Sequence, residues 1–211
     1  MTIETERQTP FFQFPAHGWV GLTLIGVFWP VNWGLSRHMP VTVWGFFPLW
    51  LGYCLTVDAL CVRRRGSSLL TRGAAKYVGL FLISAPSWWI FELLNWRLQN
   101  WHYVGRELFT DLGYLFLSTL SFSTVLPAVL GTAELFAGTR FIRGLGRGPV
   151  IRPDRRTTVT FALTGLGMFL LMMGWPKLFF PFLWISLYFM LAPVNTWLGQ
   201  RSLAETTRFG D

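Results

Sequence analysis

The sequence predicts an all-α, polytopic integral membrane protein with six transmembrane helices that form three hairpins. Three observations predict it: long apolar stretches alternate with short connections, charged residues are scarce, and positive charge gathers on every second connection. Each stretch has about the length that a helix needs to cross a hydrocarbon core of roughly 30 Å. We expect a single transmembrane domain over residues 1–211, with spans near residues 18–36, 41–62, 75–97, 110–138, 157–174 and 178–199.

The composition favours helices over strands. The 211 residues are 52% hydrophobic and only 13% charged, whereas a soluble domain carries about 25% charged residues. Backbone groups in lipid must be paired internally, so spans are helices or a closed barrel. The apolar stretches lack the alternation of barrel strands, and helices are therefore predicted.

The basic residues predict the orientation. Eleven of them lie after the second and fourth spans, and four lie after the first, third and fifth. By the positive-inside rule both termini are cytoplasmic, as expected for a multi-pass protein of a bacterial inner (plasma) membrane. The net charge of +8 then indicates contact with anionic headgroups of membrane lipids on the cytoplasmic side, and no nucleic acid partner is expected.

The first two spans contain few polar groups. Pro48 lies in the first turn of the second span, where no helical N–H is lost. Cys54 and Cys61 are expected to be core residues, with no disulfide or metal role. Asp58 lies near the cytoplasmic end of this span, as Glu134 does in the fourth, and both are expected to pair with neighbouring arginines or headgroups.

The last two spans suggest a repeat. Phe179-Phe-Pro181 opens the sixth span as Phe46-Phe-Pro48 opens the second, and Gln200-Arg-Ser-Leu203 echoes Arg65-Gly-Ser-Ser-Leu69. Two interpretations stay open: duplication of a helical hairpin, or the general preference of Phe, Pro and Trp for span ends. Pro30, Pro86, Pro127 and Pro193 fall inside spans, where they are expected to bend helices.

The third span carries the strongest candidate site. Glu92 is a deep carboxyl with no basic residue in its own helix before Arg97, and Asn95 lies on the same helical face. The candidate catalytic residues are Glu92, Asn95 and His102. The candidate ligand-binding residues are Trp88, Trp96, Asn100, Trp101, Tyr103, Asn32 and Trp33. The alternatives are a hydrogen-bonded loop cap for the polar residues and an aromatic belt at headgroup level for the tryptophans.

Other chemistries lack their motifs. The three histidines lie at unmatched depths or in loops, which does not suit a haem, zinc or iron site, so no metal is expected. No phosphate-binding loop or nucleophile elbow occurs, and the expected cofactor is none beyond a bound lipid or carotenoid.

Part of this region resembles the heterodimeric-type membrane lycopene cyclases, which are integral membrane proteins of carotenoid biosynthesis. Pro86-Ser-Trp-Trp-Ile-Phe-Glu92 and Trp101-His-Tyr-Val-Gly105 are similar to that family's acidic aromatic helix and its aromatic turn. The resemblance covers about one tenth of the chain and implies an isoprenoid or carotenoid ligand. The chain departs from the family where the Pro-x-Glu-Glu motif should follow, because it reads Thr110-Asp-Leu-Gly-Tyr114.

Three functions are compatible with these features. The first is an integral membrane scaffold or accessory subunit that binds a lipid or pigment between aromatic-rich helices and has other membrane subunits as partners. The second is a membrane enzyme that acts on an isoprenoid or carotenoid lipid, with Glu92 as general acid and tryptophan rings that stabilise a carbocation. The third is a small transporter with Glu92 and Asp58 on its path.

Overall fold

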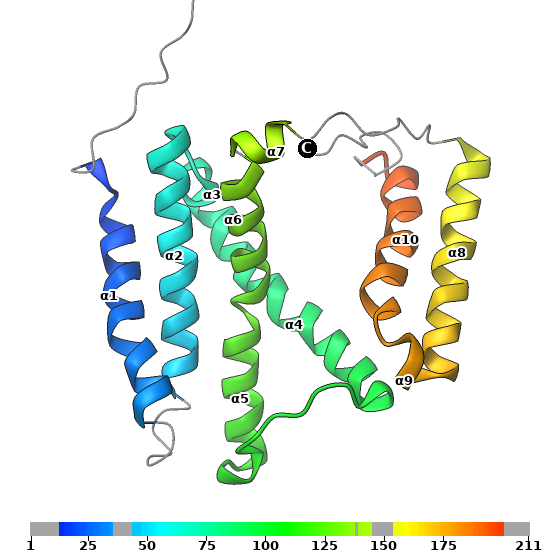
Figure 1. Ribbon diagram of the computed structural model, residues 1–211, viewed down its shortest axis with the longest axis horizontal. Helices are drawn as coiled ribbons and strands as arrows, with labels where there is room; N and C mark the ends of the chain where they lie inside the picture. Colours follow the sequence, from blue (N-terminus) through cyan, green and yellow to red (C-terminus); the bar gives the residue numbers. More distant parts are fainter. Residues whose placement is uncertain (1–12, 36–43, 138, 145–153, 201–211) are drawn as a thin grey trace, which may run out of the picture. The chain divides into compact units, whose positions relative to one another are not determined.

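The computed structural model describes residues 13–35, 44–137, 139–144 and 154–200, and in these ranges every regular element is helical (Figure 1). Four of the described helices are long and apolar enough to cross a membrane: Phe46–Arg65, Ala74–Leu98, Asp111–Ala137 and Arg155–Gly174. The prediction of an all-α membrane protein is confirmed at this level. The chain forms two compact units, one of residues 1–90 and 104–139, the other of residues 91–103 and 140–211.

The first unit opens with two antiparallel helices, α1 (Ala16–Pro30) and α2 (Phe46–Arg65) (Figure 1). A π-helical turn, Val31–Leu35, continues α1. Glycines let the two backbones approach closely: a Cβ on Gly21 would lie 2.7 Å from the carbonyl oxygen of Gly52. Small residues at a crossing are a common way to join helices in lipid, where burial of apolar surface gives no advantage.

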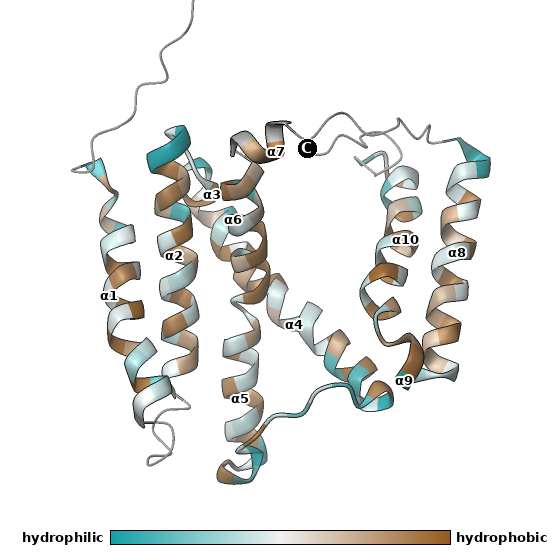
Figure 2. Ribbon diagram, viewed as in Figure 1, coloured by the Kyte–Doolittle hydropathy of each residue, from teal (hydrophilic) through white to brown (hydrophobic). Residues whose placement is uncertain are grey.

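A short helix, α3 (Leu69–Arg72), follows α2 and leads into α4 (Ala74–Leu98). Gly66 ends α2 with a φ of 74°, the left-handed conformation that suits glycine at a helix end. Ser68 and Thr71 cap α3 reciprocally through side chain and backbone. Figure 2 shows the hydrophilic end of α2, where Arg63, Arg64 and Arg65 lie, against the apolar middle of the helix.

The predicted fourth span is divided. The structure has α5 (Asp111–Phe122) and α6 (Val125–Ala137), with a break at Ser123 and Thr124. The sequence predicted one span over 110–138 with a bend at Pro127; the stretch Asp111–Ala137 is long and apolar enough to cross a membrane, and its interruption lies just before this proline. α6 packs parallel to α2. The Cys54 thiol donates to the Thr124 carbonyl at 3.7 Å and the Cys61 thiol to the Gly131 carbonyl at 3.8 Å, so both helices advance in the same direction. Both cysteines are buried, as predicted.

The second unit is built around α8 (Arg155–Gly174) and α10 (Phe182–Trp197), joined by the short helix α9 (Pro176–Phe179) (Figure 1). The sixth predicted span is therefore split into α9 and α10. Again a glycine lies at the crossing, since a Cβ on Gly165 would lie 2.9 Å from the carbonyl oxygen of Ser186. Leu98, at the end of α4, completes a core with Met172 and Leu183. Two further short elements are α7 (Arg140–Gly144) and the 3-10 turn Arg106–Leu108.

Candidate functional site

The predicted carboxyl, Glu92, lies in the last part of α4 and binds the loop that follows this helix. Its Oε1 accepts hydrogen bonds from the Trp101 indole at 3.1 Å and from the Tyr103 hydroxyl at 2.6 Å. An ionised carboxylate is an acceptor-only group, and two converging donors suit that form. Glu92 therefore fastens an aromatic loop to its own helix.

Asn95, one turn further along α4, holds the same loop by its backbone. Its Oδ1 accepts from the amides of Asn100 and Trp101 at 3.0 and 3.3 Å, and its Nδ2 donates to the Trp101 carbonyl at 2.9 Å. The backbone before this loop takes a left-handed turn at Gln99, with a φ of 51°. The buried amide of Asn95 thus satisfies loop backbone groups that helix hydrogen bonding leaves unpaired. This geometry is the loop-cap alternative that the sequence left open.

The loop also places an aromatic ring in the core of the second unit. Trp101 packs with Phe91 and Leu94 of α4 against the core of Leu98, Met172 and Leu183. Phe91 in turn stacks on Trp184 of α10, with ring centroids 4.6 Å apart. Glu92, Asn95 and Trp101 together join the end of α4 to the α8–α10 hairpin. We call these three residues with Tyr103 the α4 clamp.

The remaining predicted site residues lie in different surroundings. His102 and Asn100 are exposed on the loop, and Trp96 is 79% exposed. Asn32 donates to the Phe28 carbonyl of its own helix at 2.8 Å, and Trp33 stacks on Trp29. Asn32, Trp33 and Trp88 belong to the first unit, whereas the α4 clamp belongs to the second. A shared binding layer of all these residues stays a prediction.

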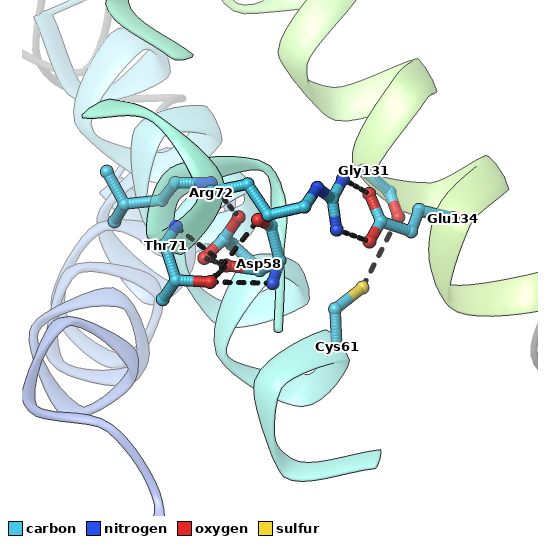
Figure 3. A network of polar contacts seen from close by, with 8 residues as sticks. Asp58, Cys61, Thr71, Arg72, Gly131 and Glu134 are labelled. Atoms are coloured by element: carbon cyan, nitrogen blue, oxygen red, sulfur yellow. Dashed lines mark hydrogen bonds and ion pairs between the residues drawn. The ribbon is translucent and has the colours of Figure 1, made fainter. Parts of the chain in front are cut away.

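A second polar cluster, which the sequence did not identify, surrounds Asp58 in the first unit (Figure 3). This carboxylate is 2% exposed and accepts from the Ser68 hydroxyl at 2.6 Å and from the Leu70 amide at 3.0 Å. The His17 Nε2 of α1 lies 3.1 Å from its Oδ2, an ionic contact when the imidazole is protonated. Asp58 therefore ties α1 and α2 to the first turn of α3.

The short helix α3 continues the network to α6. The two terminal nitrogens of the Arg72 guanidinium donate to the carboxylate of Glu134, at 2.6 and 2.7 Å (Figure 3). This bidentate bond is the main cause that raises the pKa of Arg72 above its usual value. Glu134 was expected to pair with neighbouring arginines or headgroups, and the arginine of α3 is such a partner.

Local signals for this second cluster exist in the sequence. Ser68 and Thr71 are three residues apart just before an apolar stretch, which is the spacing of an N-terminal cap. His17 lies in the first turn of α1, directly before the predicted first span. What the sequence could not give is their convergence on Asp58, because it depends on the turn at Gly66 and on the pairing of α1 with α2.

These two clusters differ from a metal centre. In the described part of the chain, no three His, Cys, Asp or Glu side chains gather closely enough to hold a metal ion. Comparisons of the chain with protein-family models, with curated proteins and with solved structures found no match.

Proposed function

We propose that this protein is an integral membrane scaffold or accessory subunit that holds a lipid or pigment against its aromatic helices. In this proposal the chain crosses a bacterial inner membrane six times as three hairpins, and both termini are cytoplasmic. Its partners are membrane lipids, with anionic headgroups at the cytoplasmic side, and other membrane subunits.

Two further helices, each shorter than a full membrane crossing, support the proposal of six spans. The π-helical turn extends α1 without a gap from Ala16 to Leu35. α10 (Phe182–Trp197) is apolar and follows α9 after two residues. With the four longer helices these give three helical pairs, and the basic residues of the connections provide the orientation.

The observation that carries the scaffold proposal is the use of Glu92 within the α4 clamp. A general acid has to present a proton to its substrate, but two donors from the protein converge on one oxygen of this carboxyl. Asp58 and Glu134 are likewise bound to other parts of the chain. The acids of the spans therefore connect helices and loops, which favours a scaffold over proton chemistry.

The ligand is inferred from exposed aromatic surfaces. Trp29 and Trp33 form a stacked pair on α1 and its π-helical turn, and both rings are exposed. Trp96 lies exposed beside the α4 clamp, and Trp184 stacks on Phe91. Flat or branched apolar molecules, such as polyenes and prenyl lipids, offer matching surfaces to tryptophan faces. Beside the clamp the loop is fixed, so such a ligand would meet a preformed surface.

The test begins with gentle purification of the full chain from its native membrane. An absorption spectrum and mass spectrometry of the lipid extract are then recorded from the same sample. We expect a stoichiometric polyene or prenyl lipid, and co-purifying membrane subunits. A colourless preparation that carries only bulk phospholipid and no further subunit would contradict the proposal.

Variants separate the scaffold from the enzyme. Trp96→Ala should lose the bound molecule, whereas Trp175→Ala, which removes another exposed tryptophan of the second unit, should keep it. Glu92→Gln keeps an oxygen acceptor for Trp101 and Tyr103, so binding should survive. Conversion of the bound lipid by the unaltered protein, abolished by Glu92→Gln with the fold intact, would instead establish acid catalysis at this residue.

A further inference from the structure

The break in the fourth span interrupts the backbone ladder between α5 and α6. In a continuous helix the amide of Leu126 would donate to the carbonyl of Phe122, four residues earlier. Pro127 follows and has no amide hydrogen, so the carbonyl of Ser123 has no donor at the usual position. Two neighbouring hydrogen bonds of the ladder are therefore altered at one place.

A side chain from α4 occupies that place. The Ser84 hydroxyl accepts from the Leu126 amide at 3.0 Å and donates to the Phe122 carbonyl at 2.6 Å. The oxygen of Ser84 thus stands between the donor and the acceptor of the missing bond, and its side chain is almost completely buried. Insertion of a side chain into the ladder is a known cause of bends in helices.

The two halves of the span are held to different degrees. α6 is fixed to the helices before it, by the Cys61 thiol on the Gly131 carbonyl and by the Arg72–Glu134 ion pair. α5 touches α2 less extensively than α6 does, and its side-chain bond to α4 is the one from the Trp89 indole to the Thr119 hydroxyl at 3.0 Å, beside the packing of the Trp89 ring on Phe122. A change at the break would therefore move α5 and leave α6 in place.

We propose that Ser84 makes the fourth span a hinge with two states. In the state described above, the hydroxyl is inserted and the ladder is open. In the second state the hydroxyl turns to the Leu80 carbonyl of its own helix, and Leu126 donates directly to Phe122. Ser87, one turn away, already makes such a bond, to the Ile83 carbonyl at 2.8 Å.

The change between the two states conserves the number of hydrogen bonds. The inserted state has one bond from Leu126 to Ser84 and one from Ser84 to Phe122. The second state has one bond from Leu126 to Phe122 and one from Ser84 to Leu80. Because the number of hydrogen bonds is the same, the two packings can lie close in free energy, as a two-state element requires. The movement of α5 would uncover the buried Phe122 ring and give an apolar molecule a path from the bilayer between α4 and α5.

The hinge is independent of the proposed scaffold function and is tested by distances between spin labels on the full chain in nanodiscs. One pair, Phe46→Cys with Leu112→Cys, reports the exposed starts of α2 and α5. A second pair, Arg64→Cys with Phe136→Cys, reports the ends of α2 and α6. Cys54 and Cys61 are buried, and protein without added cysteines gives the background labelling.

Ser84→Ala removes the inserted hydroxyl and should close the ladder. α5 has 12 residues and forms an arm of roughly 18 Å, so a turn of about 20° moves its far end by about 6 Å. We expect the Phe46–Leu112 pair to shift by about that amount and the Arg64–Phe136 pair to stay constant. Ser87→Ala deletes a hydroxyl from the same helix and should shift neither pair.

Two results would overturn the hinge. One is an unchanged Phe46–Leu112 distance in Ser84→Ala protein that keeps its helix content and its monodisperse elution. The other is an equal shift of both pairs, which would indicate general loosening. If Ser84→Ala does not fold, Pro127→Ala decides, because it returns an amide to the Ser123 carbonyl and should also close the ladder. An unchanged Phe46–Leu112 distance in that variant would equally contradict the proposal.

Discussion

The α1–α2 and α8–α10 hairpins have similar ends. Phe-Phe-Pro opens α2 in the first hairpin and comes directly before α10 in the second, and a glycine in the left-handed conformation follows each of these helices. The same 20 positions separate Phe46 from Gly66 and Phe179 from Gly199, whose φ angles are 74° and 66°. This agreement supports the duplication interpretation. A general preference of aromatic residues for span ends would not fix the number of residues between Phe-Phe-Pro and the glycine.

The middles of the two hairpins are also alike. Gly21 faces Gly52 and Thr56, and Gly165 faces Ser186 and Met190. The hydroxyls of Thr56 and Ser186 are both buried at these crossings without a hydrogen-bond partner. Each hairpin is thus joined by close backbone contact, which does not require polar bonds.

The hairpins differ where other segments join them. Asp58 lies 12 positions after Phe46, and the residue 12 positions after Phe179 is Leu191, which is exposed. The first unit uses Asp58 to hold the turn and helix at residues 66–72. The second unit uses the α4 clamp to hold residues 99–103. In both units a buried polar side chain is placed where the backbone leaves the helix and needs partners.

Removal of Asp58 should produce the largest difference in stability effect between the two hairpins. Asp58→Ala leaves the Ser68 hydroxyl and the Leu70 amide without their acceptor, and buried donors left without a partner cost about 1–3 kcal/mol each. The melting temperature in detergent should fall by roughly 6–12 °C. Leu191→Ala, at the matching place in the second hairpin, should change it little. Equal effects at the two positions would show that Asp58 has no special structural role.

Glycine substitutions test the feature that the hairpins share. Gly21→Ala and Gly165→Ala each place a Cβ within 3 Å of backbone atoms of the opposite helix, and overpacking of this kind costs about 2 kcal/mol. Gly26→Ala and Gly167→Ala meet nothing within 4 Å and should stabilise their helices slightly. Thermal unfolding of the four variants measures the difference. Unchanged stability in Gly165→Ala would show that the α8–α10 crossing does not depend on a glycine as the α1–α2 crossing does.

The clamp of the second unit should give a smaller and more local effect. Asn95→Ala removes the acceptor of two loop amides and the donor to the Trp101 carbonyl, at a cost of about 1–2 kcal/mol. Hydrogen exchange of residues 99–103 should accelerate while residues 66–72 keep their protection. Asn100→Ala deletes an exposed amide from the same loop and should leave exchange unchanged. Faster exchange in both segments would contradict the inference that Asp58 and the α4 clamp hold their segments independently.

The sequence predicted what depends on local pattern. The long helices, the place of Pro48 in the first turn of α2, and the burial of Cys54 and Cys61 follow from apolar runs and from backbone preferences. The loop-cap interpretation of Asn95 was also available, because an amide near a helix end commonly binds loop backbone. These features need only residues that are close in the chain.

The features that the sequence missed depend on distant residues. The break in the fourth span requires Ser84 of α4, which lies 38 residues before the Phe122 carbonyl that it binds. A local sign was present, since Ser118, Thr119, Ser121, Ser123 and Thr124 precede Pro127 inside an apolar run. The pairing of Glu134 with Arg72 depends on α3, a four-residue helix too short to show a hydrophobic period.

The smallest effect concerns the first helix of each hairpin. Asp154 begins α8 and accepts from the Thr157 amide at 2.7 Å, and these hydrogen bonds from Thr157 lower the pKa of its carboxyl below the ordinary value of 3.8. Pro15 begins α1 without a side-chain cap. A carboxyl with a lowered pKa stabilises the folded state above its unfolded pKa, and this contribution disappears as the pH falls through the folded pKa.

Below about pH 3.8, exchange in the first turn of α8, corrected for the intrinsic rate, should therefore accelerate, and that of α1 should not. Asp154→Asn keeps a good cap that does not titrate, so its first turn should be insensitive to pH over the same range. A rise of the same size in the Asn variant would assign the effect to another group. A flat profile in the unaltered protein would mean that the Asp154 cap contributes nothing to the order of this turn.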